Sequence, residues 1–380
     1  MSTADFVIVG GGIAGLSVGA ELACAGHKVI VLEREQHAGM HSSGRSAAVF
    51  MGSYGNATVR ALSGASRHVL MASDTLWEGS IVRERGALFI ASTDQSATLR
   101  AFVENRRALQ PSLEIAGGEE ARRRVPILRP DYVDTCVYDS DAFDVEVNAL
   151  LQAYAKQLRG AGGEIRTDCE FIGATRDGGS WSVRTNGAEI ACGRIINAAG
   201  AWADETASRC GIEPIGLEPR RRSAFLVAAP DGVEIDAWPL VFDVDEQFYF
   251  KPDAGLILIS PANEDPSPPC DAWPEEIEVA TGAYRVEQAT TLTIRSIKSQ
   301  WAGLRTFARD RTPIVGEAER GGFFWCAGQG GYGVQMAPAL ARCTAAVASG
   351  SEWPADLAAL GVTADTLSPA RFPTLQTCNG

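Results

Sequence analysis

Four residues near the N-terminus have the types and spacing of a dinucleotide-binding site. Gly10, Gly12 and Gly15 form a Gly-x-Gly-x-x-Gly pattern directly after the β-branched run 6–9, and Glu33 ends a second apolar run. The glycines allow a tight turn, a close approach of the backbone to a pyrophosphate, and close packing of a helix on a strand. Free N–H groups at the helix start attract the pyrophosphate, and the acidic side chain accepts from ribose hydroxyls. This order predicts a dinucleotide site that NAD or FAD could fill.

The segment that follows favours FAD. Residues 34–48 are polar and small, whereas an NAD-binding domain would continue with another plain βα unit. Such a stretch suits a loop that wraps a large cofactor. A second glycine-rich loop at 328–333 precedes the predicted helix 334–348, so another helix N-terminus can meet an electron-rich group.

Histidine and cysteine usage argues against several other kinds of catalytic site. The four histidines lie between positions 27 and 68, and the nine cysteines are scattered without a Cys-x-x-Cys pair. A Ser/His/Asp hydrolase or a zinc site is hard to build from such a set, so we expect no metal. We expect reduced thiols and a cytoplasmic location. In an enzyme of this composition, a cofactor supplies the hard chemistry.

Charge and hydropathy bear on the partners. With 34 Lys+Arg against 47 Asp+Glu, the net charge of −13 makes nucleic acid a poor partner. No stretch approaches the ~18–20 apolar residues of a membrane helix, so we expect no transmembrane segment. The 380 residues leave room for two domains. We expect a monomer.

Patterns along the chain predict how these domains are organised. Asp144 is a candidate N-cap for a helix that ends at the glycines after 159, and strands follow from 164, around 181–191 and at 194–197. By contrast, 84–143 and 217–300 contain strand-like runs (86–91, 223–227, 247–251, 255–259) and a proline-rich stretch, 261–274, expected to be a surface loop.

These patterns predict an α/β fold with a Rossmann-like FAD-binding domain and an inserted, mostly antiparallel β-sheet substrate domain. The FAD-binding domain is expected to be discontinuous, comprising residues 1–83, 144–216 and 301–380. The substrate-binding domain comprises residues 84–143 and 217–300.

Taken together, the motifs resemble the FAD-dependent D-amino acid oxidase and dehydrogenase superfamily, which includes glycine and sarcosine oxidases. Within it, the likeness is strongest to bacterial D-arginine dehydrogenases, and it covers nearly the whole chain. The matching segments are 10–15, 41–48, 197–202, 221–225, 248–255, 289–295, 301–305 and 328–335.

This resemblance implies FAD, bound non-covalently, and a set of site residues. The implied cofactor-binding residues are Gly10, Gly12, Ile13, Ala14, Gly15, Glu33, Arg34, Ser42, Arg45, Ser46, Ala47, Ala48, Glu170, Phe171, Ala199, Gly200, Gly303, Arg305, Gly331, Tyr332, Gly333, Val334 and Gln335. The implied substrate-binding residues are Arg222, Arg305, Tyr54, Tyr249, Val49, Gly86 and Gly331. Two of these, Tyr54 and Tyr249, are the catalytic candidates.

The implied activity is the oxidative deamination of D-amino acids. Flavin takes a hydride from Cα at its N5, and the imino acid that is released hydrolyses to a 2-oxo acid and ammonia. Arg222 and Arg305 suit a carboxylate clamp because a guanidinium binds a carboxylate through two parallel hydrogen bonds. No strong general base is required; Tyr54, Tyr249 or water can relay the amine proton. Without the resemblance, Arg222 would suit a solvated face and Tyr249 a core position.

Two departures from the D-arginine-type pattern bear on the substrate. The relatives carry a carboxylate on the strand that here reads 86–88, and a histidine at the position of Val49. Because an unpaired buried guanidinium is costly, we expect apolar or bulky side chains to be preferred over arginine and lysine. A secondary-amine or N-substituted glycine oxidase and a non-catalytic flavin-binding subunit stay open as alternatives. The resemblance favours a dehydrogenase with a quinone or dye-like electron acceptor, and an oxidase that uses oxygen stays open.

Overall fold

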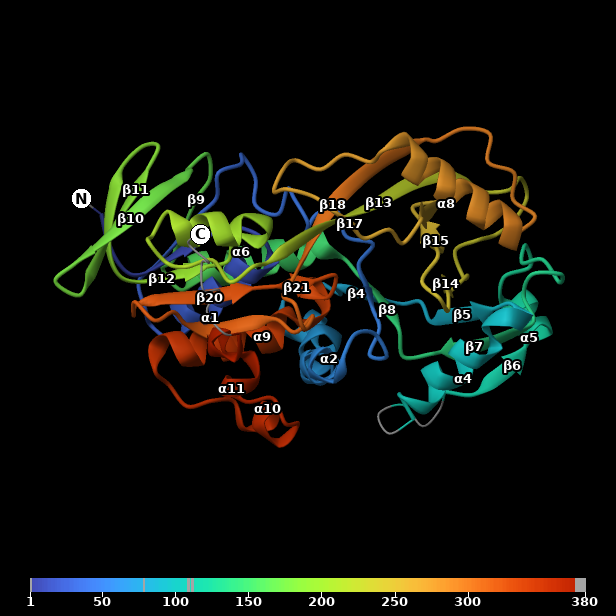
Figure 1. The fold of residues 1–380 in the computed structure, drawn as a ribbon, viewed down its shortest axis with the longest axis horizontal. Helices are drawn as coiled ribbons and strands as arrows, with labels where there is room; N and C mark the ends of the chain where they lie inside the picture. The colour runs from blue at the N-terminus through green and yellow to red at the C-terminus, as the bar shows by residue number, and fades with distance from the viewer. Residues whose placement is uncertain (1, 78, 108–109, 111–112, 373–380) are drawn as a thin grey trace, which may run out of the picture.

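The structure is a computed structural model that describes residues 2–77, 79–107, 110 and 113–372. Within these residues the strands form an eight-stranded, a ten-stranded and a three-stranded sheet. Figure 1 shows an elongated molecule with the two large sheets towards opposite ends. The long strands β13 (Glu218–Ala228) and β18 (Ser299–Phe307) of the second sheet reach towards the first.

The eight-stranded sheet contains a parallel centre in the order β9-β2-β1-β12-β20. Its strands are β1 (Ser2–Val9), β2 (Val29–Leu32), β9 (Glu164–Arg166), β10 (Phe171–Asp177), β11 (Ser180–Thr185), β12 (Glu189–Asn197), β19 (Ile314–Glu317) and β20 (Phe323–Ala327). Residues 6–9 of β1 and all of β2 are apolar, mostly β-branched and buried on both faces, which is typical of parallel sheets.

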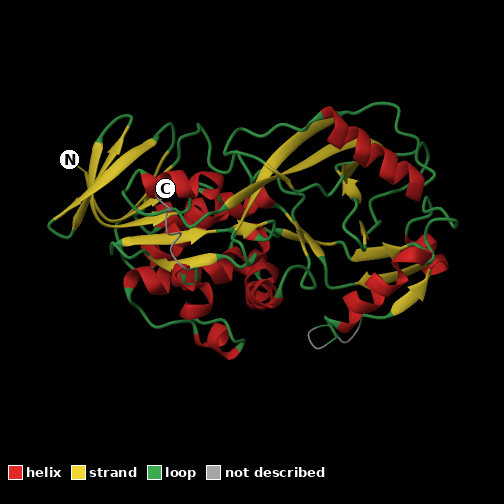
Figure 2. Cartoon of the chain, viewed as in Figure 1, coloured by secondary structure: helices red, strands yellow, loops and turns green. Residues whose placement is uncertain are grey.

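Helices flank this first sheet (Figure 2). The helices that pack on it or border it are α1 (Ile13–Cys24), α2 (Ala57–Met71), α3 (Ser73–Leu76), α6 (Val147–Gly160), α7 (Ala203–Ser208), α9 (Gly333–Ser349), α10 (Ala355–Ala359) and α11 (Ala364–Leu367). The apolar residues of α1, α6 and α9 form one core with the sheet. Short 3₁₀ turns, Gly200–Trp202 and Pro369–Arg371, complete this half.

The ten-stranded sheet runs in the order β21-β18-β13-β16-β15-β14-β5-β7-β6, with β17 beside β13. Its remaining strands are β5 (Ala87–Ala91), β6 (Ile115–Gly117), β7 (Thr135–Asp139), β14 (Leu240–Asp243), β15 (Tyr249–Asp253), β16 (Leu256–Ser260), β17 (Asp265–Pro266) and β21 (Gln329–Gly330). Its pairs are antiparallel except β14 with β5. Helices α4 (Ser96–Glu104), α5 (Gly118–Arg124) and α8 (Glu276–Ala289) and the 3₁₀ turn Thr93–Gln95 accompany it.

The predicted fold class is confirmed: an α/β sheet with helices on both faces is joined to a mostly antiparallel second sheet. The expected runs 247–251 and 255–259 correspond to β15 and β16, which form an antiparallel pair, and the runs expected up to 191 and at 194–197 belong to one strand, β12. The domain boundaries stay a prediction. Strand pairing favours moving one of them, because residue 301 lies inside β18, which pairs along its length with β13.

The prediction for Asp144 is wrong. It lies in β8 (Phe143–Val145), which forms the small sheet with β3 (Val49–Phe50) and β4 (Val82–Glu84), and Glu146 is the residue that precedes α6. The Asp144 carboxylate is buried and accepts from Arg85 (2.7 Å) and Lys251 (2.9 Å). Its side chain therefore ties the sheets together, a long-range role that local capping patterns do not reveal.

Candidate active site

One elongated cavity runs from the β1–α1 turn to the strands of the second sheet, and most of the predicted site residues line it. Three predicted residues are not among its lining: Gly15, Tyr332 and Gly86. Gly15 packs under the cavity, where a Cβ would lie 1.9 Å from the Gly10 carbonyl oxygen. Gly86 instead faces the Tyr138 ring, so the structure does not bring it to the predicted substrate position.

At the cofactor end the cavity is bordered by backbone. Gly10 has φ +108°, and a Cβ there would lie 2.4 Å from the Ala198 carbonyl oxygen, so glycine is required. Helix α1 begins after Gly12 without a side-chain cap, and Gly12, Ile13 and Ala14 line the cavity. The Ile13 N–H donates to the Ser43 hydroxyl (3.0 Å). Ser43 is not among the site residues predicted from the sequence. Gly12 itself offers no side-chain cap, so the N–H groups of this helix start that Ser43 does not bind can attract a pyrophosphate.

Glu33 lies where the second strand ends, as predicted. Its carboxylate is buried and accepts from the backbone N–H groups of Gly11 (2.9 Å) and Glu35 (3.0 Å). It also lines the cavity, so its remaining lone pairs can accept from ribose hydroxyls. Farther along, Glu170 and Phe171 line the same end, as do Ala199 and Gly200, which follow β12.

The wrapping loop 34–48 lies against both halves of the molecule. Arg45 donates to the carbonyl oxygens of Ala272 (2.9 Å) and Ala302 (3.0 Å) and pairs with Asp271 (2.5 Å). Ser42 donates to the Leu304 carbonyl oxygen (2.5 Å). Arg34, Ser46, Ala47 and Ala48 also line the cavity. The loop is thus fixed by strand β18 and by the segment before α8, far away in the sequence.

A second helix start without a side-chain cap, that of α9, borders the cavity close to the start of α1, because a Cβ on Gly333 would lie 3.8 Å from the Ile13 side chain. Gly331, Gly333, Val334 and Gln335 line the cavity there. The Gln335 amide accepts from the N–H of Met51 (3.1 Å) and donates to Ser63 (2.7 Å). Tyr332 lies behind, edge-on to Tyr54, and burial raises its pKa to about 12. The two helix N-termini both place partial positive charge at the wall of this cavity.

Arg222 and Arg305 both line the far end of the cavity. They lie on the paired strands β13 and β18, with Arg222 opposite Gly303. Arg305 donates to the Tyr54 hydroxyl (3.3 Å), and a Cβ on Gly331 would lie 2.1 Å from its guanidinium. Burial lowers the pKa of Arg305. Tyr54 and Glu264 raise this pKa by more than burial lowers it, so it lies above its usual value. The guanidinium is therefore permanently charged.

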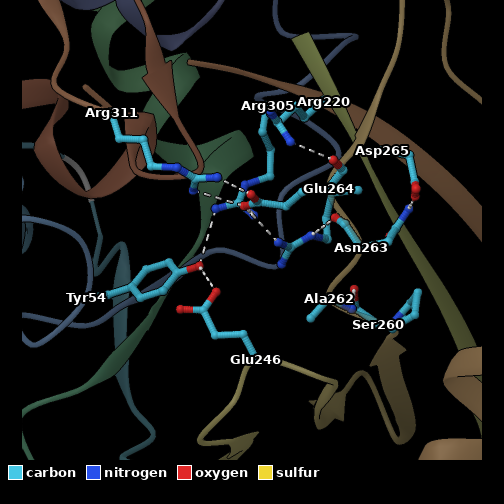
Figure 3. A network of polar contacts seen from close by, with 12 residues as sticks. Tyr54, Arg220, Glu246, Ser260, Ala262, Asn263, Glu264, Asp265, Arg305 and Arg311 are labelled. Atoms are coloured by element: carbon cyan, nitrogen blue, oxygen red, sulfur yellow. Dashed lines mark hydrogen bonds and ion pairs between the residues drawn. The ribbon is translucent and has the colours of Figure 1, made fainter. Parts of the chain in front are cut away.

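A third charged residue, Glu264, binds both arginines and was not predicted from the sequence. It lies in the stretch 261–274, which the sequence predicts to be a surface loop. Its carboxylate binds Arg305 (2.9 Å) and Arg311 (Figure 3), and also Arg222 (3.4 Å). The neighbouring carbonyl of Asn263 accepts from Arg222 Nε (2.7 Å). The surface-loop prediction is therefore wrong for these residues. Nothing local distinguishes Glu264 from a solvated acid, because its partners lie about 40 residues away.

Beside Arg222 and Arg305, the cavity wall is apolar and aromatic. Tyr249 stacks on Phe242 with ring centroids 5.5 Å apart, and Tyr54 meets Phe242 edge-on. The other apolar residues on this side are Val49, Met51, Ala224 and Leu240. Glu84, the nearest acid in sequence to the strand where relatives carry a carboxylate, is exposed on β4 and does not line the cavity.

Comparison with known proteins identifies the class to which this fold and site belong. The family model for FAD dependent oxidoreductases (DAO) matches residues 5–347. The chain therefore belongs to the DAO family of FAD-dependent oxidoreductases, and FAD is its cofactor. The family assignment fits the glycine turn, the acidic residue at the strand end and the two uncapped helix starts.

Individual relatives span nearly the whole chain. Glycine oxidase from Geobacillus kaustophilus is 24% identical over 94% of this chain and 96% of its own length. Glycine oxidase from Pseudomonas aeruginosa is 27% identical over 91% of this chain and 95% of its own length. Among solved structures, L-proline dehydrogenase from P. horikoshii has a TM-score of 0.83 at 22% identity, covering 98% of both chains. The activity common to these findings is FAD-dependent oxidation of an amino acid or amine.

None of the helices in the described ranges combines the length and the apolar character needed to cross a bilayer.

Proposed function

We propose that the protein oxidatively deaminates D-amino acids with apolar or bulky side chains. The observation that carries this proposal is the pair Arg222 and Arg305 at the end of a cavity whose adjoining wall is apolar. Two guanidinium groups bind a carboxylate through parallel hydrogen bonds and fix its orientation. Bound FAD supplies a hydride acceptor for the Cα–H.

The chain's own residues position the substrate and exclude water. Arg222 and Arg305 orient the carboxylate, while Phe242 and Tyr249 form a stacked wall for the side chain. The Tyr54 hydroxyl, within 3.3 Å of Arg305 and 3.5 Å of Glu246, can pass an amine proton towards solvent. Since no carboxylate lines the apolar wall among the described residues, a substrate guanidinium would be left unpaired.

The test is an anaerobic visible spectrum of the purified protein mixed with D- and L-amino acids of graded side chains. We expect the flavin absorbance to bleach fastest with apolar D-amino acids. The highest kcat/KM with D-arginine or with L-enantiomers would contradict the proposal. Readmitting air then separates an oxidase, whose colour returns quickly, from a dehydrogenase that needs a quinone or dye-like acceptor.

A second candidate keeps the clamp and changes the amine: oxidation of N-substituted glycines or other secondary amines. It is favoured by the similarity to glycine oxidases and to a solved iminodiacetate oxidase (TM-score 0.82, 20% identity). Sarcosine, iminodiacetate and proline in the same panel distinguish the two candidates. A flavin that no amine bleaches would favour a non-catalytic flavin-binding subunit.

A further inference from the structure

The carboxylate clamp contains an internal negative charge. Glu264 Oε1 accepts from Arg305 Nη1 (2.9 Å) and Arg222 Nη2 (3.4 Å), and Arg311 binds both of its oxygens. Figure 3 shows the Glu264 carboxylate beside the guanidinium groups of Arg305 and Arg311. Its burial alone would raise the pKa of Glu264, but Arg311, Arg305 and Arg222 together lower it, so the group is ionised at neutral pH.

Glu264 does not itself border the substrate. Arg222 and Arg305 line the cavity, whereas Glu264 and Arg311 are not among its lining residues. The carboxylate therefore approaches the guanidinium groups from outside the cavity wall, and a substrate carboxylate can approach them from inside. Glu264 is held in this place by its own backbone, because its carbonyl accepts from Arg220 (3.2 Å) and β17 pairs with β13 directly after it.

This arrangement can discriminate between an amino acid and the 2-oxo acid with the same carbon skeleton. An amino acid arrives as a zwitterion, whereas its 2-oxo acid product carries a net negative charge. The fixed negative charge of Glu264, a few ångströms away, repels the anionic 2-oxo acid. It also repels the carboxylate of the zwitterionic amino acid, but it attracts the ammonium group of that ligand, and the two effects offset each other. We propose that Glu264 is a specificity-determining residue that makes the clamp favour zwitterionic amino acids over the corresponding 2-oxo acids and other simple carboxylates. The amino-acid part of this inference rests on the proposed function.

The test uses the FAD-loaded protein and Glu264→Gln, which removes the charge and keeps the shape of the side chain. Benzoate, a carboxylate without an amine, is titrated by calorimetry and by the change in flavin absorbance. We expect the Kd of benzoate to fall about tenfold in Glu264→Gln. An unchanged or higher Kd, or no binding to either protein, would overturn the inference.

Two further variants accompany this test: one changes another charge of the same cluster, and the other is a matched control. Arg311→Gln removes a positive charge from the same cluster, so the Kd of benzoate should rise; it also serves if Glu264→Gln does not fold. Glu275→Gln is the matched control, because Glu275 pairs with Arg221 on the same strand (2.5 Å), and Arg221 is not among the cavity-lining residues. An equal fall in Kd for Glu275→Gln would mean that only the total charge of the protein matters.

Turnover adds a second measurement. The ratio of the inhibition constant of the 2-oxo acid to the KM of its amino acid should fall about tenfold in Glu264→Gln. A ratio that stays constant contradicts the inference even if turnover is rapid. Conversely, if no amine reduces the flavin, the proposed function fails, while the benzoate titration still reports whether Glu264 sets the charge of the clamp.

Discussion

The two ends of the cavity present different chemical groups to the ligands proposed for them. The cofactor end uses mostly backbone: the Gly10 turn and the uncapped starts of α1 and α9. The substrate end uses side chains: Arg222 and Arg305 from β13 and β18, with Glu264 behind them, and Tyr249 from β15. Backbone recognition needs particular local conformations, whereas side-chain recognition needs distant strands to meet. The two ends should therefore respond to different kinds of substitution.

The largest expected effect is at the substrate end. Arg305→Ala should lower kcat/KM by at least ~100-fold, because it removes a buried charged partner of the carboxylate. The flavin-to-protein absorbance ratio should stay near that of the wild type. Arg83→Ala, at an exposed arginine of β4, is the control and should leave kcat/KM unchanged. Loss of flavin in Arg305→Ala would mean that the two ends are not independent.

The corresponding substitution at the cofactor end is Gly10→Ala. Its φ of +108° and the 2.4 Å approach to Ala198 should weaken FAD binding at least tenfold, since a non-glycine residue in left-handed backbone alone costs about 1–2 kcal/mol. The flavin content after dialysis measures this. Gly26→Ala is matched to it, having φ +88° but nothing within 4 Å of an added Cβ. Equal flavin loss in both variants would show that strain, and not the close approach, is decisive.

Gly331 lies where the two ends meet, so it sharpens the comparison. In Gly331→Ala the added Cβ would displace the Arg305 guanidinium, and we expect KM to rise several-fold with a smaller change in kcat and little loss of flavin. Gly64→Ala is the control: it is exposed within α2 with nothing near an added Cβ, and should stabilise the protein by about 0.5–1 kcal/mol. A Gly331→Ala protein that loses flavin but keeps its KM would assign Gly331 to the cofactor end.

The smallest effect expected is the pH dependence of the Glu264 cluster. The folded-state pKa of Glu264 lies below its usual 4.5, so its ion pairs stabilise the protein above pH 4.5. This contribution is lost as the pH falls through the folded-state pKa. The difference in Tm between wild type and Glu264→Gln should thus be constant from pH 7 to pH 5 and shrink below pH 4.5. A difference that shrinks already between pH 7 and pH 5 would contradict the ionised carboxylate.

The sequence by itself determined the cofactor end and the fold class. Gly10, Gly12, Gly15 and Glu33 fall within a single βαβ unit, so their spacing fixes their geometry and a local pattern suffices. Arg222, Arg305 and Tyr249 were identified only through resemblance, because an arginine or tyrosine in a strand has no local signature of function. Their meeting at one end of the cavity follows from the pairing of β13 with β18.

Only the tertiary structure decided the roles of Glu264 and Asp144. Both are acids whose partners lie on other strands: Glu264 meets arginines on β13 and β18, and Asp144 meets Lys251 on β15. Read locally, one looks like a solvated loop residue and the other like a helix cap. A buried carboxylate needs paired charges, and those charges arrive through strand pairing over about 40 to 100 residues. Contacts over such sequence distances leave no periodicity in the sequence, so they can be identified only in the tertiary structure.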